Sequence, residues 1–170
     1  MRELLEPCRT SVLQRPPGVA VYDYSPGENR QVNRDFAFLK GKDLGTLRIH
    51  DPFALKSPFN ADCVQRLLEQ LSSLWRSFPK EIFLRAREPE PSPQTATLET
   101  VLRKYVDSKG SKFALYKVPS YGPKRRDFHD RRLVFATSAQ KPVRTEVLLT
   151  GGVDRYVEPR FETSLVVRRA

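Results

Sequence analysis

Cysteine and histidine are scarce in this chain of 170 residues. It has two cysteines, Cys8 and Cys63, and two histidines. Two cysteines cannot build the network of disulfides that stabilises many small secreted proteins. Together with only two histidines, they also fall short of a closed zinc site. We therefore expect a protein of a reducing compartment with no disulfide framework, no metal and no cofactor.

Long apolar runs are missing as well. No stretch approaches the roughly 18 apolar residues that a membrane-spanning helix needs. The N-terminus carries Glu3, Glu6 and Pro7 where a secretory signal would be apolar. These features predict a cytoplasmic protein, whose contact with a membrane would be peripheral.

Acidic residues are too few to balance the basic ones. The chain has 20 Asp+Glu against 30 Lys+Arg, a formal net charge of +10. Excess cations favour phosphate-bearing partners such as nucleic acid, anionic lipid or a phosphorylated ligand. The alternative interpretation is a solubilising surface without a ligand.

The pattern along the chain predicts one folded domain. Residues 1–18 lack periodicity and end in Arg-Pro-Pro-Gly, which indicates an N-terminal arm or linker before a domain at 19–170. Strand-like segments occur at 19–22, 46–50, 82–84, 113–118, 131–136, 143–149 and 163–167.

Two segments have apolar residues at helical spacing. One helix is expected to carry Val64 to Phe78, with Asn60 as its N-cap and Pro79 ending it. A second is expected to carry Leu98 to Val106 and to end before Gly110. Strands alternating with helices and then following one another predict an α/β sandwich with a mixed sheet flanked by helices.

The most basic stretch runs from Tyr121 to Arg132 and holds five Lys/Arg and two Asp. It lies between two predicted strands. A basic loop leading into a strand can present cations to a phosphate, and positions i and i+2 of a strand share a face. This places His129 and Arg131 on one side, whereas the alternative is a solvated charged loop without function.

Several motifs in this half of the chain resemble one family. They are His129-Asp130-Arg131-Arg132, then Thr150-Gly151-Gly152-Val153-Asp154-Arg155-Tyr156, then Glu162-Thr163-Ser164, preceded by Leu47-Arg48-Ile49-His50-Asp51-Pro52-Phe53. Their order and spacing over residues 20–168 resemble the phospholipase D-like domain at the C-terminus of MIT (microtubule-interacting and trafficking) proteins. The resemblance implies a phospholipase D-like fold, a homodimer, and a basic surface that binds acidic phospholipid headgroups.

The basic loop and the motifs of the resemblance together give the candidate site residues. The phosphate-binding candidates are Lys124, Arg125, Arg126, His129, Arg131 and Arg132, and the supporting ones are Asp51, Asp130, Gly151, Gly152 and Asp154. Arginine stays charged and holds phosphate with two hydrogen bonds, so phosphate binding can outlast catalysis.

Catalytic phospholipase D chemistry needs His-x-Lys-x4-Asp followed by Gly-Ser-x-Asn. Here Arg131 takes the lysine position, Ala136 the acid position, and Asp154 the asparagine position. The groups that would stabilise the transition state are therefore missing. We expect a degenerate site, in which His129 is the catalytic residue if there is one.

Three functions follow from these observations. The first is a non-catalytic module that binds phosphate-bearing polyanions, acidic phospholipid headgroups above all, through the basic loop. The second is a nucleic-acid-binding protein, in which Tyr121 and Phe128 could stack on bases. The third is a dimeric single-motif phosphodiesterase or nuclease that uses His129, since one motif per chain requires two chains. Protein partners in an assembly are left open.

Overall fold

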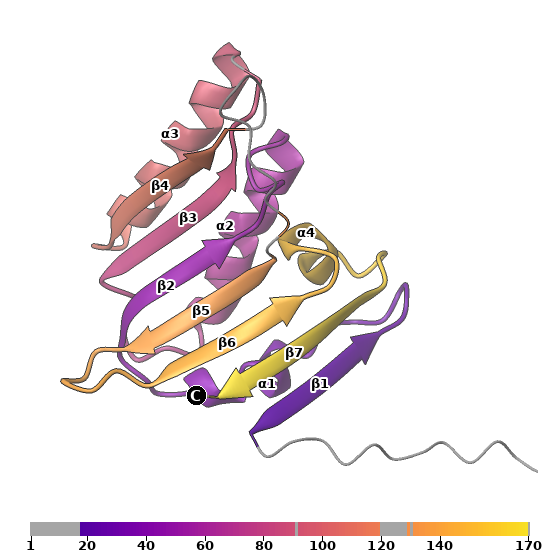
Figure 1. Ribbon diagram of the computed structural model, residues 1–170, viewed down its shortest axis with the longest axis vertical. Coiled ribbons are helices and arrows are strands. Elements are labelled where there is room, and N and C mark those ends of the chain that lie inside the picture. The colour runs from indigo at the N-terminus through magenta and orange to yellow at the C-terminus, as the bar shows by residue number, and fades with distance from the viewer. Residues whose placement is uncertain (1–17, 91, 120–128, 130, 170) are drawn as a thin grey trace, which may run out of the picture.

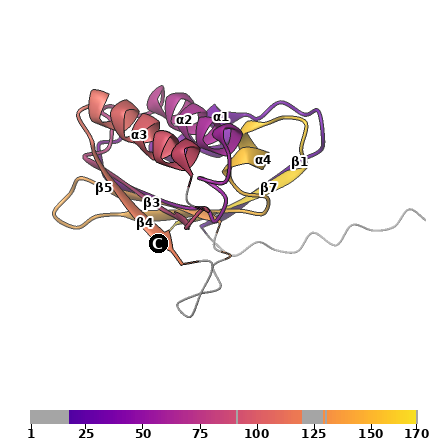
Figure 2. The same ribbon diagram turned by 90° about the horizontal axis from the view of Figure 1, so that it is seen from above.

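The computed structural model describes residues 18–90, 92–119, 129 and 131–169. Within them, a seven-stranded mixed sheet carries four α-helices and one short 3-10 helix, all on the same face (Figures 1 and 2). The predicted α/β class and the mixed sheet are confirmed. The helices form a single layer, so no helix of the described residues lies over the opposite face.

The strands cross the sheet in the order β1-β7-β6-β5-β2-β3-β4. Their bounds are β1 Val19–Tyr24, β2 Leu44–His50, β3 Glu81–Arg87, β4 Lys112–Val118, β5 Arg132–Thr137, β6 Arg144–Leu149 and β7 Thr163–Arg169. Strands β2, β3 and β4 are parallel to one another, and the other neighbours are antiparallel. Parallel neighbours need a crossover connection, which α2 (Pro58–Ser72) and α3 (Pro93–Ser108) supply.

Strand β3 is longer than its predicted core at residues 82–84. Its buried residues continue to Ala86, and Arg85 and Arg87 alternate with them on the uncovered face. They pair in register with Tyr116 and Val118 of β4. Charged residues at alternate positions conceal such a strand from a search for apolar runs.

Helix α2 begins earlier than predicted. The Ser57 hydroxyl accepts a hydrogen bond from the backbone nitrogen of Asn60 at 3.3 Å, and Pro58 is the first helical residue. Asn60 as the N-cap is therefore wrong. Ser57 followed by Pro58 is the better start, because serine offers an acceptor and proline has no N–H to satisfy.

Helix α2 also ends earlier than predicted, at Ser72 rather than at Pro79. The hydroxyls of Ser72 and Ser73 bond to backbone carbonyls three residues before them, which competes with continuation of the helix. Trp75 and Phe78 nevertheless pack on the core from the following turn, with ring centroids 5.2 Å apart.

Helix α3 agrees with its predicted end. It stops at Ser108, and Gly110 follows with a φ of 73°, the left-handed conformation expected at this position. Neither α3 nor any other helix in the described part of the chain is long and apolar enough to cross a membrane.

A buried carboxylate holds the lobe beside β1 together. Asp35 ends α1 (Val32–Asp35), just before the 3-10 helix η1 (Ala37–Leu39), and its side chain is fully buried. It accepts hydrogen bonds from the hydroxyls of Tyr24 at 2.5 Å and Tyr156 at 2.9 Å, and from Arg34 at 3.0 Å. Tyr156 belongs to α4 (Val153–Val157), so Asp35 joins the neighbouring elements β1 and α1 to α4, which is distant in sequence.

Alkaline pH should weaken this contact. Burial and the hydrogen bond to Asp35 raise the pKa of Tyr24 to about 12, and burial raises the pKa of Tyr156 as well. A tyrosine in the unfolded chain loses its proton near pH 10. The unfolded state therefore binds fewer protons above pH 10, and the free energy of unfolding falls between about pH 10 and 12. Urea unfolding from pH 8 to 11.5 measures this fall, and it should be shallower in Tyr24→Phe. An equal fall in both proteins would contradict the assignment.

Candidate functional site

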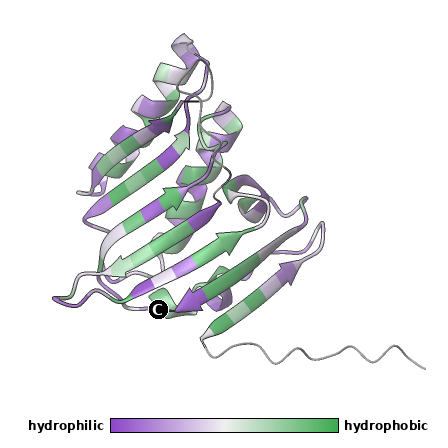
Figure 3. Ribbon diagram, viewed as in Figure 1, coloured by the Kyte–Doolittle hydropathy of each residue, from purple (hydrophilic) through white to green (hydrophobic). Residues whose placement is uncertain are grey.

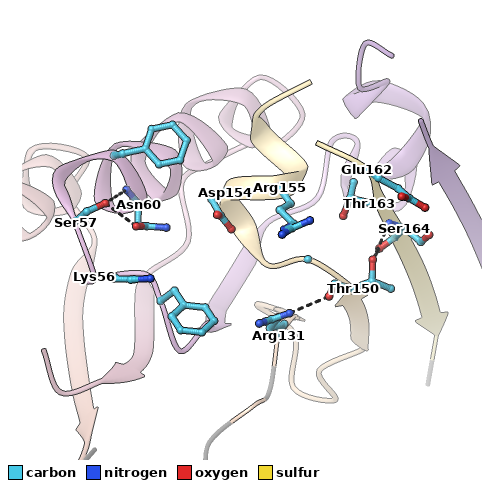
Figure 4. A pocket seen from close by; sticks show the side chains of 13 residues that line it. Lys56, Ser57, Asn60, Arg131, Thr150, Asp154, Arg155, Glu162, Thr163 and Ser164 are labelled. Atoms are coloured by element: carbon cyan, nitrogen blue, oxygen red, sulfur yellow. Dashed lines mark hydrogen bonds between the residues drawn. The ribbon is translucent and has the colours of Figure 1, made fainter. Parts of the chain in front are cut away.

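The segments that carry the family resemblance meet at one end of the sheet, around a groove of about 710 Å³. It is lined by Phe53, Lys56, Ser57, Phe59 and Asn60 from the β2–α2 region, by Arg131, by Thr150, Gly151, Asp154 and Arg155 from the β6–α4 region, and by Glu162, Thr163 and Ser164 near the start of β7 (Figure 4). Each of the four motifs thus contributes to the groove or lies directly beside it.

Asp51 joins the turn that follows β2 to the turn between β6 and α4, and residues of both turns line the groove. It is 2% exposed, and its carboxylate accepts hydrogen bonds from the backbone nitrogens of Phe53 at 2.9 Å and Val153 at 2.7 Å. Burial raises the pKa of Asp51, and the two backbone hydrogen bonds oppose that rise. Because its oxygens are used within the fold, Asp51 has a structural role behind the groove.

The two glycines of the β6–α4 turn allow close packing there. Gly152 has φ 90° and ψ −179°, a conformation open essentially to glycine alone, and a Cβ on it would lie 3.0 Å from Asp51 Oδ2. A Cβ on Gly151 would lie 2.7 Å from the Cβ of Arg155. The side chain of Arg155 therefore lies against Gly151 because no side chain is present there.

Arg30 fixes the loop that follows α4. Its guanidinium donates hydrogen bonds to the backbone carbonyls of Tyr156 at 3.0 Å, Arg155 at 3.1 Å and Glu158 at 3.3 Å, and to that of Phe161. A charged donor at the C-terminal end of a helix satisfies carbonyls that have no partner within it. Arg30 thus holds the backbone from which Arg155 enters the groove.

Three cations gather around the ring of Phe53. Lys56 Nζ lies 5.4 Å from the ring centroid, Arg87 Cζ 5.5 Å and Arg131 Cζ 5.3 Å. Arg131 Nη1 also donates to the carbonyl of Thr150 at 3.0 Å. Among the described residues, neither Lys56 nor Arg131 forms an ion pair. Like charges this close repel one another, and a bound anion would relieve that repulsion.

Carboxylates on the other side of the groove reduce its net positive charge. Asp154 and Glu162 line it together with the basic residues Lys56, Arg131 and Arg155. In Figure 4, Lys56 and Arg131 approach the groove from one side, and Asp154 and Arg155 from the α4 side. The cationic part is therefore the side around Phe53, where an anion would avoid Asp154.

The predicted geometry of His129 and Arg131 needs a correction. Neither residue lies in a strand, because the pairing of β5 begins at Arg132, so the i and i+2 argument does not apply. They are connected in another way. His129 Nδ1 lies 3.4 Å from Arg87 Nη2, and Arg87 shares the Phe53 ring with Arg131.

The other candidates separate into three groups. Gly151 and Asp154 line the groove, and Gly152 lies behind it with Asp51. Arg132 does not line the groove, and its Nη1 lies 2.9 Å from Glu146 Oε1. The basic loop residues Lys124, Arg125 and Arg126, and also Asp130, lie outside the described residues.

Sequence reasoning missed three cations of this region, Lys56, Arg87 and Arg155. They come from three different segments, and only the fold brings Arg87 to Phe53. Lys56 had a usable signal, since it directly precedes the Ser57-Pro58 helix start, where backbone N–H groups favour an anion.

The groove also has a neighbour. Phe53, Lys56 and Ser57 line a second cavity of about 510 Å³ that Arg87 and the start of α3 complete. Phe53 and its cations therefore separate two hollows rather than forming the floor of one.

The described residues include no group of three or more His, Cys, Asp or Glu side chains that could hold a metal ion. Cys63 is buried in α2, and burial raises the pKa of its thiol to about 12. The thiol is therefore protonated at neutral pH and unsuited to act as a nucleophile.

Comparison with known proteins adds no relative: no protein-family model matches the chain, and no curated protein matches it significantly.

Proposed function

We propose that the chain is a non-catalytic phospholipase D-like module that binds phosphate groups, foremost those of acidic phospholipid headgroups, in the groove beside Phe53. The observation that carries this proposal is the cluster of Lys56, Arg87 and Arg131 around one aromatic ring. The basic loop at Lys124 to Arg126 would add long-range attraction to an anionic surface.

The phospholipase D-like fold is part of the proposal. Its support is that segments centred on Phe53, Arg131, Asp154 and Thr163, which are far apart in the sequence, line one groove. These are the segments on which the resemblance rests. A chance similarity of short motifs would give no reason for them to meet.

The absence of turnover is proposed for a chemical reason. Hydrolysis of a phosphodiester needs donors around the phosphoryl oxygens, and each missing donor typically costs about 10²–10³ in rate. Here Asp154 brings a carboxylate to the groove, and Gly152 offers no side chain. His129 is not among the residues that line the groove, and its Nδ1 lies 3.4 Å from Arg87 Nη2.

Vesicle binding tests the proposal. Removal of Lys56 and Arg131 together, as Lys56→Ala/Arg131→Ala, should weaken binding to phosphatidylserine-containing vesicles about thirtyfold, because each cation near an anionic surface contributes about 1 kcal/mol. Co-sedimentation at several salt concentrations measures the affinity, which should fall as salt rises. Vesicles of phosphatidylcholine alone should not bind.

The matched control is Lys80→Ala/Lys104→Ala. It removes the same charge at two exposed positions that do not line the groove. Equal losses in both double variants would mean that net charge, and not the groove, binds the vesicles. Unchanged binding in Lys56→Ala/Arg131→Ala, with an unchanged unfolding transition, would refute the proposal.

A further inference from the structure

All helices of the described residues lie on one face of the sheet, and none of them covers the opposite face (Figure 2). Figure 1 looks onto this face, and Figure 3 colours the same view by hydropathy. All-parallel sheets normally have both faces covered, and β2, β3 and β4 form the parallel part of this mixed sheet. The face over these three strands, which no described helix covers, is therefore a candidate binding surface.

Strand register defines which side chains lie on this face. One row across the sheet runs Val21, Val166, Leu148, Arg132, His50, Arg85 and Tyr116, and the next runs Val19, Arg168, Glu146, Val134, Arg48, Phe83 and Ala114. The third row adds Arg144, Glu81 and Lys112. In these rows the basic side chains clearly outnumber the carboxylates, and one carboxylate, Glu146, is paired with Arg132.

The part of the face over β2, β3 and β4 combines cations with aromatic rings. Arg48 and Phe83 are register partners, and the guanidinium lies 5.9 Å from the ring centroid. Arg85 and Tyr116 are register partners on the neighbouring row, at 5.8 Å. Tyr116 is 44% exposed, and Arg48 is exposed as well. Two cation–aromatic pairs therefore lie on neighbouring rows of this face, and in each pair one side chain, Arg48 or Tyr116, is exposed while its partner is half-buried.

This combination has a specific chemical use. Bases of single-stranded nucleic acid stack on aromatic rings and on guanidinium planes, while phosphates bind to cations between them. A second copy of the chain would bring like charges together on this face, which disfavours a symmetric contact. A membrane surface would use the cations but would leave the aromatic pairs without a stacking partner.

We propose that the β2–β3–β4 part of the uncovered face binds single-stranded nucleic acid, with bases stacking on the Arg48–Phe83 and Arg85–Tyr116 pairs. Recognition of this kind is tolerant of sequence, because every base has a flat face. The inference does not rest on phosphate binding in the groove, since no residue of these two pairs lines that groove.

The test is fluorescence anisotropy with labelled single-stranded oligothymidine and oligouridine of 12 nucleotides, titrated at several salt concentrations. Tyr116→Ala should weaken binding about tenfold or more through lost stacking, with an unchanged salt dependence. Tyr116→Phe should bind like the parent protein. The logarithm of the affinity falls as the logarithm of the salt concentration rises, and in Arg48→Ala this fall should be less steep by about 0.7, the contribution of one phosphate contact.

Controls separate this surface from the groove. Lys104→Ala, on α3 in the helix layer, should bind the oligonucleotides like the parent protein apart from the loss of one charge. Lys56→Ala/Arg131→Ala should impair vesicle binding. In that double variant, adding Tyr116→Ala should still weaken oligonucleotide binding about tenfold or more. The proposal is wrong if the oligonucleotides do not bind, or if Tyr116→Ala and Arg48→Ala, folded as judged by thermal unfolding, bind like the parent. It is also wrong if Tyr116→Ala instead converts a dimer into a monomer in sedimentation velocity.

Discussion

Replacing Asp35 with alanine is expected to lower the free energy of unfolding by about 2–6 kcal/mol, because two buried hydroxyls lose their acceptor and each such loss costs about 1–3 kcal/mol. The hydroxyls are those of Tyr24 and Tyr156, which donate to the same carboxylate oxygen, Oδ2. Arg34 is half exposed and can be solvated by water after the substitution. The loss therefore comes from the tyrosines rather than from a stranded buried charge.

Urea unfolding followed by Trp75 fluorescence measures this effect. Tyr156→Phe is the matched control, since it removes one of the same hydrogen bonds and leaves the carboxylate, and should cost about 1 kcal/mol. Asp35→Asn should fall between the two, because the amide keeps one acceptor oxygen. A loss below 1 kcal/mol in Asp35→Ala would show that the carboxylate does not hold β1, α1 and α4 together.

The positions of the strands were largely predictable, because strand formation leaves a local signature. The buried Leu47 and Ile49 alternate with less buried, polar residues, and such a period of two is visible in sequence. Helix ends were less predictable. The apolar spacing continues through Trp75 and Phe78, yet the chain leaves the helix at Ser72, after which Trp75 is buried and Phe78 packs against the core. The spacing of apolar residues predicts which side chains are buried, but it does not predict whether the backbone that carries them is helical.

The candidate site was predictable only in part. Arg131 and Asp154 were found because they stand in motifs that resemble a known family. Arg87 could not be found, since its place beside Phe53 depends on β3 pairing with β2. The role of Asp35 was equally hidden, because its partner Tyr156 is 121 residues away along the chain.

The uncovered sheet face illustrates the same limit. Arg48 and Phe83 lie in different strands, and the sequence of neither strand indicates that the two residues are neighbours. Register alone brings them together as partners. The order of the strands was therefore the missing information, since it decides which side chains share a surface.

Replacing Gly152 with alanine is the second substitution with a large expected effect. The backbone there has φ 90° and ψ −179°, and a residue with a Cβ pays about 1–3 kcal/mol to adopt such a conformation. The new Cβ would also lie 3.0 Å from Asp51 Oδ2, the atom that accepts the hydrogen bond from the Val153 nitrogen. Asp51 is held by its bond to Phe53 and cannot move away freely. We therefore expect the loss of unfolding free energy to reach about 3 kcal/mol, the upper end of the backbone cost.

Gly41→Ala separates the two contributions to that loss. Gly41 also has a positive φ of 67°, but a Cβ on it would meet nothing within 4 Å. It should therefore show only the cost of a left-handed backbone, about 1–2 kcal/mol. Because Asp51 ties the β6–α4 turn to Phe53, Gly152→Ala should also weaken vesicle binding, whereas Gly41→Ala should leave it unchanged. Equal losses of stability in the two variants, with equal vesicle binding, would mean that Asp51 and Gly152 do not shape the groove.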